Sequence, residues 1–181
     1  INMISRSGSN AFHGSAFMFT RSNSLVGNGP NDREYGEFSD RSFGGRIGGP
    51  IVRDKLFFFF LGEANRRDRP SGFSIGGPTG NDFGHYAEAA RFQQIMRDVW
   101  NHDVGSTDEF IRSTDNDNFF IRADANIADG HQLTIRHNYV NGGNLIIRPS
   151  SYWYQWPDNH YDIQIKTNSF VTQLNSVFSN D

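Results

Sequence analysis

The sequence has no cysteine among its 181 residues, which excludes disulfide bonds, thiol catalysis and zinc sites built from cysteine. It has no run that approaches the roughly 18 apolar residues a membrane-spanning helix requires. It also lacks a basic excess, since 17 Lys and Arg stand against 20 Asp and Glu for a net charge of -3. Phosphate-binding surfaces carry such an excess, so the composition argues against nucleic acid as a partner.

Motifs for catalysis and metal binding are missing as well. Neither GxSxG nor HExxH occurs, and the six histidines are scattered. The glycine-rich stretch 44–50 ends in Pro50, where a phosphate-binding loop needs Lys followed by Ser or Thr. The stretch 115–118 begins like a calcium loop, but Phe119 and Phe120 occupy the positions that need an oxygen ligand and a glycine. We therefore expect a protein that is not an enzyme and that holds no cofactor or metal ion.

Aromatic residues and glycine are abundant instead. The chain contains 17 Phe, 6 Tyr and 3 Trp, together 14% of its residues, and 19 Gly. Leucine and valine, which usually supply much of a soluble core, are scarce. Aromatic side chains therefore make up a larger share of the apolar residues in this chain than in an ordinary soluble domain.

Alternation of apolar and polar residues with a period of two predicts β-strands. The clearest case runs from Phe119 to Ile127, where Phe119, Ile121 and Ala123 alternate with Arg122 and Asp124. Similar or weaker patterns predict six strands in all, at residues 12–21, 42–52, 56–66, 118–128, 131–141 and 163–178.

One helix is predicted between the third and fourth strands, at about residues 84–100. Phe92, Ile95, Met96 and Val99 follow the spacing of one helical face. We expect Asn81 or Asp82 to cap the N-terminus of this helix.

Long and tight connections alternate between the predicted strands. Segments 22–41, 67–117 and 142–162 are long, whereas 52–55 and 128–130 are tight. In an antiparallel meander every long loop then lies at one end, as in outer-membrane barrels, whose strands need about 9–11 residues to span the bilayer. We expect an all-β antiparallel meander that forms part of an outer-membrane β-barrel, with one helix in an external loop.

A soluble β-sandwich is the alternative that strand alternation leaves open. The residues on the polar face favour the barrel, because Arg122, Asp124, Arg136 and Asn138 suit a water-filled lumen.

The hairpin around Gly130 allows a sharper prediction. Opposite residues share a face, so the apolar rows of the two strands meet only if paired residue numbers differ by an even amount. A two-residue Asp129–Gly130 turn would set Ile127 opposite Gln132 and violate this rule. We predict a three-residue loop, 128–130, with Gly130 at positive φ, and Asp124 directly or diagonally across from Arg136.

Two segments resemble a known family. Residues 1–15, INMISRSGSNAFHGS, resemble the junction between plug and barrel in TonB-dependent outer-membrane receptors. Residues 42–59, SFGGRIGGPIVRDKLFFF, are similar to a signature of the Oar-like subgroup, which often carries a carboxypeptidase-regulatory-like domain upstream of the plug. The resemblance implies that 1–11 end the plug and that 12–181 begin the barrel of a larger polypeptide. The glycines in 44–49 are then expected where wall and plug approach closely or where the strand bends.

The resemblance also implies a function for the whole protein. It would lie in the bacterial outer membrane, contact its lipid, and take up an unidentified ligand when a TonB-type energy-coupling protein displaces the plug. A different class of function stays open on the residues alone, namely a soluble or surface β-domain that binds carbohydrate or protein without transport.

An aromatic cluster supplies the candidate ligand contacts. It consists of residues in or next to the last long loop: Tyr152, Trp153, Tyr154, Trp156 and Tyr161. Such rings can stack on a sugar or grip a peptide, and they are equally typical of the aromatic belt at a membrane interface. The cluster is therefore either a set of ligand contacts or part of such a belt.

Overall fold

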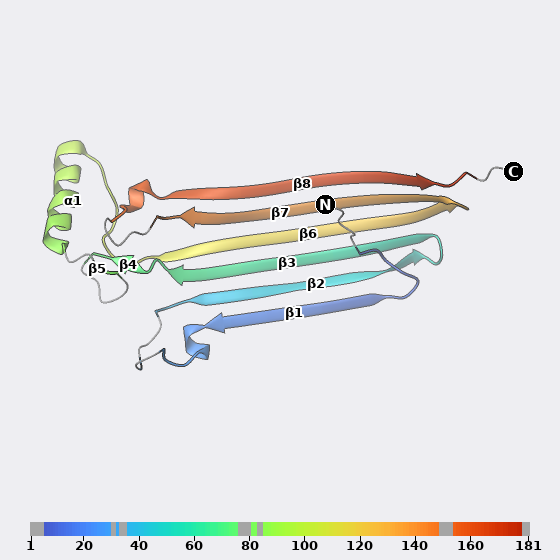
Figure 1. Ribbon diagram of the computed structural model, residues 1–181, viewed down its shortest axis with the longest axis horizontal. Helices are drawn as coiled ribbons and strands as arrows, with labels where there is room; N and C mark the ends of the chain where they lie inside the picture. The colour runs from blue at the N-terminus through green and yellow to red at the C-terminus, as the bar shows by residue number, and fades with distance from the viewer. Residues whose placement is uncertain are drawn as a thin grey trace.

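The computed structural model describes residues 6–29, 32, 36–75, 81–82, 85–148 and 154–178. Six long strands form one antiparallel sheet in the order β1-β2-β3-β6-β7-β8 (Figure 1). These are β1 (His13–Ser22), β2 (Ser39–Val52), β3 (Leu56–Pro70), β6 (Ile111–Ala128), β7 (His131–Ile146) and β8 (Tyr161–Ser176). The predicted six-stranded meander is confirmed, with β3 paired to both β2 and β6.

The sheet is open. Within the described residues, β1 pairs only with β2, and β8 pairs only with β7. Six strands of this length leave two edges whose backbone groups need partners, as predicted for part of a large barrel.

The long connections gather at one end of the sheet, at the left of Figure 1, and the tight turns lie at the other end. The long-loop end carries helix α1 (Tyr86–Trp100), the 3-10 helices η1 (Asn23–Leu25) and η3 (Pro157–Asn159), and a short parallel pair, β4 (Phe73–Ser74) with β5 (Asn81–Asp82). The predicted N-cap is wrong, because Asn81 and Asp82 form β5 and the residue at the cap position is His85.

The register of the sheet brings a row of mostly apolar side chains from neighbouring strands to one side, which we call the apolar face, whereas Phe17 and Phe19 of β1 lie on the other side. Phe60 lies opposite Ile47 on β2 and Ile121 on β6, and the same row continues through His137 to Phe170. Ile47, Ile121 and Phe170 are 46%, 42% and 67% exposed. Large side chains exposed over a whole sheet face are what the lipid-facing wall of a barrel requires.

The apolar face has a defined height. On β3 it runs from Leu56 to Ala64, after which Arg66 follows on the same side, and Arg66 lies opposite Asp115. Eight residue steps at strand rise span about 27 Å along the strand, and the usual strand tilt of about 35–45° reduces this to a height of about 19–22 Å, somewhat below the roughly 25 Å apolar band of outer-membrane barrels. The strands then continue past this band toward the long loops. Their predicted ends were therefore too short: β3 extends to Pro70, and β6 already begins at Ile111.

The β6–β7 hairpin has the even pairing that was predicted. Asn126 lies opposite Gln132, and Gly130 has φ of +73°. The predicted three-residue loop is replaced by an Asp129–Gly130 turn closed by Ala128 and His131, with a shift of register between Asn126 and Ala128. This bulge at position 127 supplies the extra residue that keeps the apolar rows on one face.

Gly130 is the most constrained position of this hairpin. We expect Gly130→Ala to destabilise the protein by about 1–2 kcal/mol, because its φ is positive and a Cβ would lie 2.9 Å from the carbonyl oxygen of Val177. Gly62→Ala is the control, since its Cβ would meet only Phe60 ring atoms at 3.5 Å or beyond. Urea unfolding of both variants in lipid vesicles measures the difference, and equal losses would contradict the argument.

Candidate functional site

A buried ion pair occupies the side of the sheet opposite the apolar face, which we call the polar face. Arg122 donates to both carboxylate oxygens of Asp124, with nitrogen–oxygen distances of 2.8–3.1 Å. The Thr134 hydroxyl donates to the same carboxylate at 2.7 Å. Asp124 is 2% exposed and Thr134 6% exposed. Arg136 lies diagonally across from Asp124, as predicted, because Arg136 itself faces Arg122.

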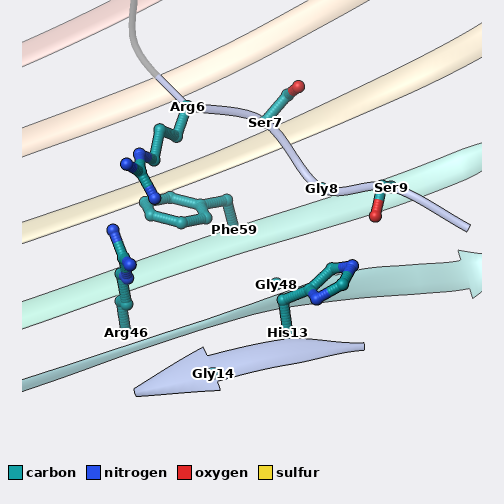
Figure 2. Close-up of a pocket in the computed structure, with 9 residues that line it drawn as sticks. All are labelled: Arg6, Ser7, Gly8, Ser9, His13, Gly14, Arg46, Gly48 and Phe59. Carbon is teal, nitrogen blue, oxygen red and sulfur yellow. The ribbon is translucent and has the colours of Figure 1, made fainter. Parts of the chain in front are cut away.

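The segment that precedes β1 crosses the polar face. A Cβ on Gly48 would lie 3.7 Å from the Cα of Gly8 and 3.0 Å from the ring of Phe59, so the chain passes closely over β2 and β3. Figure 2 shows residues Arg6–Ser9 running over these strands. Gly48 thus lies where the segment before β1 approaches the sheet closely, and a register shift between Pro50 and Val52 makes β2 irregular.

This crossing encloses a pocket of about 200 Å³. Arg6 comes from the crossing segment, and Arg46 and Phe59 come from the wall (Figure 2). The Arg46 guanidinium donates to the Ser15 hydroxyl at 2.9 Å. Cationic side chains from both the crossing segment and the wall, together with an aromatic ring of the wall, therefore line the pocket.

We expect Gly8→Ala to lift the crossing segment from the wall. A Cβ at this position would collide with the carbonyl oxygen of Phe58 and would lie 2.9 Å from that of Gly49. Amide hydrogen exchange in residues 6–11 should rise about tenfold, which corresponds to about 1.4 kcal/mol of lost local stability. Gly27→Ala is the matched control, since nothing lies within 4 Å of its Cβ position. Unchanged exchange in Gly8→Ala would contradict the close contact.

The long loops form a packed cap at their end of the sheet. Ile75, Ala89, Val104 and Ile147 are buried there, each 8% exposed or less. The backbone NH of Ile75 donates to the Thr107 carbonyl at 2.9 Å. This bond lies within the β3–β6 connection, and the backbone NH of Asp158 in the last long loop donates to the Val104 carbonyl at 3.4 Å, so the cap joins two long loops.

Polar contacts tie the last long loop to the helix-bearing loop. His102 contacts Asp158, with Nε2 and Oδ2 2.7 Å apart. The Tyr154 hydroxyl donates to the Ser106 carbonyl at 3.1 Å. Burial, reinforced by the charge of Asp108, raises the pKa of Tyr154. The phenol therefore stays protonated and keeps its donor role across the neutral range.

The neighbouring His160 lies between the loop and the sheet. Burial lowers the pKa of His160, against the opposing effect of its hydrogen bond with the Gln155 carbonyl. Its ring lies 5.3 Å from that of Phe110. A lowered pKa favours the neutral imidazole at neutral pH, which suits its position beside an aromatic ring.

The structure brings two of the five candidate ligand residues together. The Trp156 ring lies 5.3 Å from Tyr154 and 5.1 Å from Phe92 on α1. Tyr161 begins β8 and is 46% exposed. Tyr152 and Trp153 lie outside the described residues. The contact between Trp156 and α1 was not foreseen, since the 3.6-residue period of the helix indicates an apolar face but does not name its partner.

No group of three or more His, Asp or Glu in the described part of the chain could hold a metal ion. No helix among the described residues is long and apolar enough to cross a membrane.

Comparisons with known proteins agree with this architecture. Residues 4–83 match the family described as Outer membrane beta barrel domain. The TonB-dependent transporter Oar of Myxococcus xanthus is 42% identical over 67 residues, which cover 33% of this chain and 6% of that protein. The chain thus spans a small part of the length of this curated relative. No solved structure matches it.

The matched family, the open meander of long strands and the exposed apolar face agree with one another. The chain therefore lies in the outer membrane, as β-barrel wall that resembles the Oar-like TonB-dependent transporters.

Proposed function

We propose that this chain forms the first part of the barrel wall, and residues 1–11 the end of the plug, of a transporter that takes up a ligand across the outer membrane. A TonB-type protein would supply the energy by displacing the plug. The observation that carries the proposal is the passage of residues 6–9 over the polar face before they enter β1. A plug inside the lumen must reach the wall along such a path. The name of the Myxococcus relative supports energy coupling.

Single-cysteine labelling in cells tests the displacement. The chain has no cysteine of its own, so Ser7→Cys places one thiol in the crossing segment. In the full-length protein in energised cells, a membrane-impermeant maleimide should label it faster than after treatment with a protonophore. Ser24→Cys in η1, on the long-loop side, is the control and should label equally in both states. Equal labelling of Ser7→Cys in both states would contradict energy-coupled displacement.

We further propose that the aromatic cluster Tyr152, Trp153, Tyr154, Trp156 and Tyr161 contacts the ligand. Its described members, Tyr154, Trp156 and Tyr161, lie on the long-loop side, where a ligand arriving from outside would meet the protein. Stacking on an aromatic ring contributes about 1–3 kcal/mol per base in nucleic-acid complexes, used here as an analogy. Replacing Trp153 and Trp156 by Ala should therefore weaken binding about tenfold.

Calorimetry with maltohexaose and with a tetrapeptide measures this effect, because a sugar and a peptide are the two ligand types that such rings suit. Trp100→Ala is the control, since Trp100 lies on the same side at the end of α1 and is 69% exposed. Equal affinities for the double variant, the control and the unmodified protein would leave these rings as structural or interfacial residues.

A further inference from the structure

Three arginines surround one carboxylate where the polar face meets the long loops. Arg21 on β1 and Arg69 on β3 approach Oδ2 of Asp40 at 2.6 and 2.8 Å, and Arg67 approaches Oδ1 at 3.1 Å. Asp40 is 18% exposed in its side chain, whereas the three arginine side chains are 47–58% exposed. The carboxylate is thus enclosed and the cations remain open to solvent.

The charges of this group do not balance. Three guanidinium groups against one carboxylate leave an excess of two positive charges within the ion-paired group. The nearby carboxylates Glu37 and Asp68 line an adjoining hollow and form no ion pair with these arginines within the described residues. Each guanidinium has five N–H donors, of which Asp40 uses only one from each arginine. The other donors of Arg21, Arg67 and Arg69 have no acceptor among the described residues. Such a fork of unused donors matches the geometry of an oxyanion.

Two of these arginines, Arg21 and Arg69, line a pocket that also has an apolar side. It measures about 540 Å³, and its lining includes Arg21 and Arg69 together with Val26, Phe38 and Pro70. The Arg21 guanidinium lies 5.6 Å from the centre of the Phe38 ring. The volume falls within the usual range of about 300–1,000 Å³ for small-molecule sites. Charge and apolar surface therefore meet in one pocket on the lumen side of the wall.

We propose that this pocket binds an organic anion in which a carboxylate is attached to an apolar group. The carboxylate accepts hydrogen bonds from Arg21 and Arg69, and the apolar group packs against Val26, Phe38 and Pro70. Asp40 holds the guanidinium groups in place and limits the positive charge, so that release remains possible. The inference adds an organic anion to the ligand types considered for the transporter and rests on the proposed function, although binding itself needs no energy coupling.

The test uses 2-naphthoate as the probe and the full-length protein in detergent micelles or nanodiscs, with calorimetry as the readout. We expect 2-naphthoate to bind at least tenfold more tightly than its neutral isostere 2-naphthamide. It should also bind more tightly than inorganic phosphate, which has the charge without the apolar group. Phosphate binding as tight as that of 2-naphthoate would overturn the apolar half of the proposal, and equal binding of the amide would overturn the anionic half.

Two variants with opposite expected effects on the affinity for 2-naphthoate distinguish ligand recognition from damage to the fold. Arg69→Gln should weaken 2-naphthoate binding about tenfold, while Asp40→Asn, which removes the competing carboxylate, should strengthen it about threefold or more. A merely structural role would weaken binding in both. Arg53→Gln is the matched control, because Arg53 is exposed in the tight β2–β3 turn at the opposite end of the sheet. Wild-type affinity in Arg69→Gln, or weakened affinity in Asp40→Asn, would overturn the proposal.

Failure of this test and failure of the proposed function remain distinguishable. If 2-naphthoate binds as described but Ser7→Cys labels equally with and without the protonophore, the pocket stands and energy-coupled uptake is rejected. If labelling depends on energy but the anion, its amide and phosphate bind alike, the transport proposal stands and this ligand class is rejected.

Discussion

Replacing Asp124 by alanine is expected to lower the free energy of unfolding by about 3–5 kcal/mol, a large share of a typical protein's net stability. The reason is that removing one partner of a buried ion pair leaves the other charge without compensation. Arg122 is 17% and Asp124 3% exposed in their side chains, so both have given up most of their hydration. Removing the carboxylate leaves the guanidinium in a largely dry position without the bidentate acceptor that compensates its charge.

The matched control lies on the same strand. Asp117 also pairs with an arginine, at 2.6 Å from Arg66, but these side chains are 45% and 34% exposed beyond the apolar band. Water screens such a pair, so Asp117→Ala should cost at most about 1 kcal/mol. Urea titration of the vesicle-embedded protein, followed by tryptophan fluorescence, measures both losses. The double variant Arg122→Ala with Asp124→Ala should lose less than the sum of the single variants. Equal costs for Asp117→Ala and Asp124→Ala would contradict the burial argument.

The membrane-crossing part of each strand could be predicted because lipid imposes a pattern on the sequence. On β6 the residues from Phe119 to Ala125 alternate, since one side faces hydrocarbon and the other faces the lumen. Beyond the band both sides are wet, and residues 111–117 read Ile-Arg-Ser-Thr-Asp-Asn-Asp without a period of two. That stretch is nevertheless strand, because its backbone continues the hydrogen-bonded ladder to Arg69 and beyond. The sequence signal ends where the bilayer ends, and the pairing does not.

The candidate site likewise has one part that local sequence could indicate and another part that depends on strand pairing. The crossing segment falls within residues 1–15, whose resemblance to a plug–barrel junction indicated it, whereas nothing indicated the arginines around Asp40. Arg21, Asp40 and Arg69 come from three strands, and only the pairing of Arg21 with Asp40, and of β2 with β3, brings them together. No spacing within one segment encodes such a cluster. Only a correct prediction of the register between β1, β2 and β3 could have revealed this cluster.

Placing an arginine on the apolar face should be almost as damaging as breaking the buried ion pair. Ile121 lies in the middle of the band, between Phe60 on β3 and His137 on β7, and is 42% exposed. We expect Ile121→Arg to cost about 2–4 kcal/mol, the range for arginine at the midplane of an outer-membrane barrel. The strand cannot turn the arginine side chain toward the lumen, since the neighbouring strands hold its backbone in register.

Ser169→Arg tests whether the cost belongs to the lipid side and not to arginine itself. Ser169 lies on the polar face of β8 opposite Asn138, which in turn faces Phe120, so its depth matches that of Ile121 within one residue. There the guanidinium would enter the lumen, where water and polar side chains solvate it, and the change should stay below about 1 kcal/mol. Urea titration in vesicles measures both variants under one condition. If Ser169→Arg cost more than Ile121→Arg, the two faces would have to be exchanged, and residues 6–9 would then cross the lipid side, which is physically untenable for a segment with exposed backbone groups.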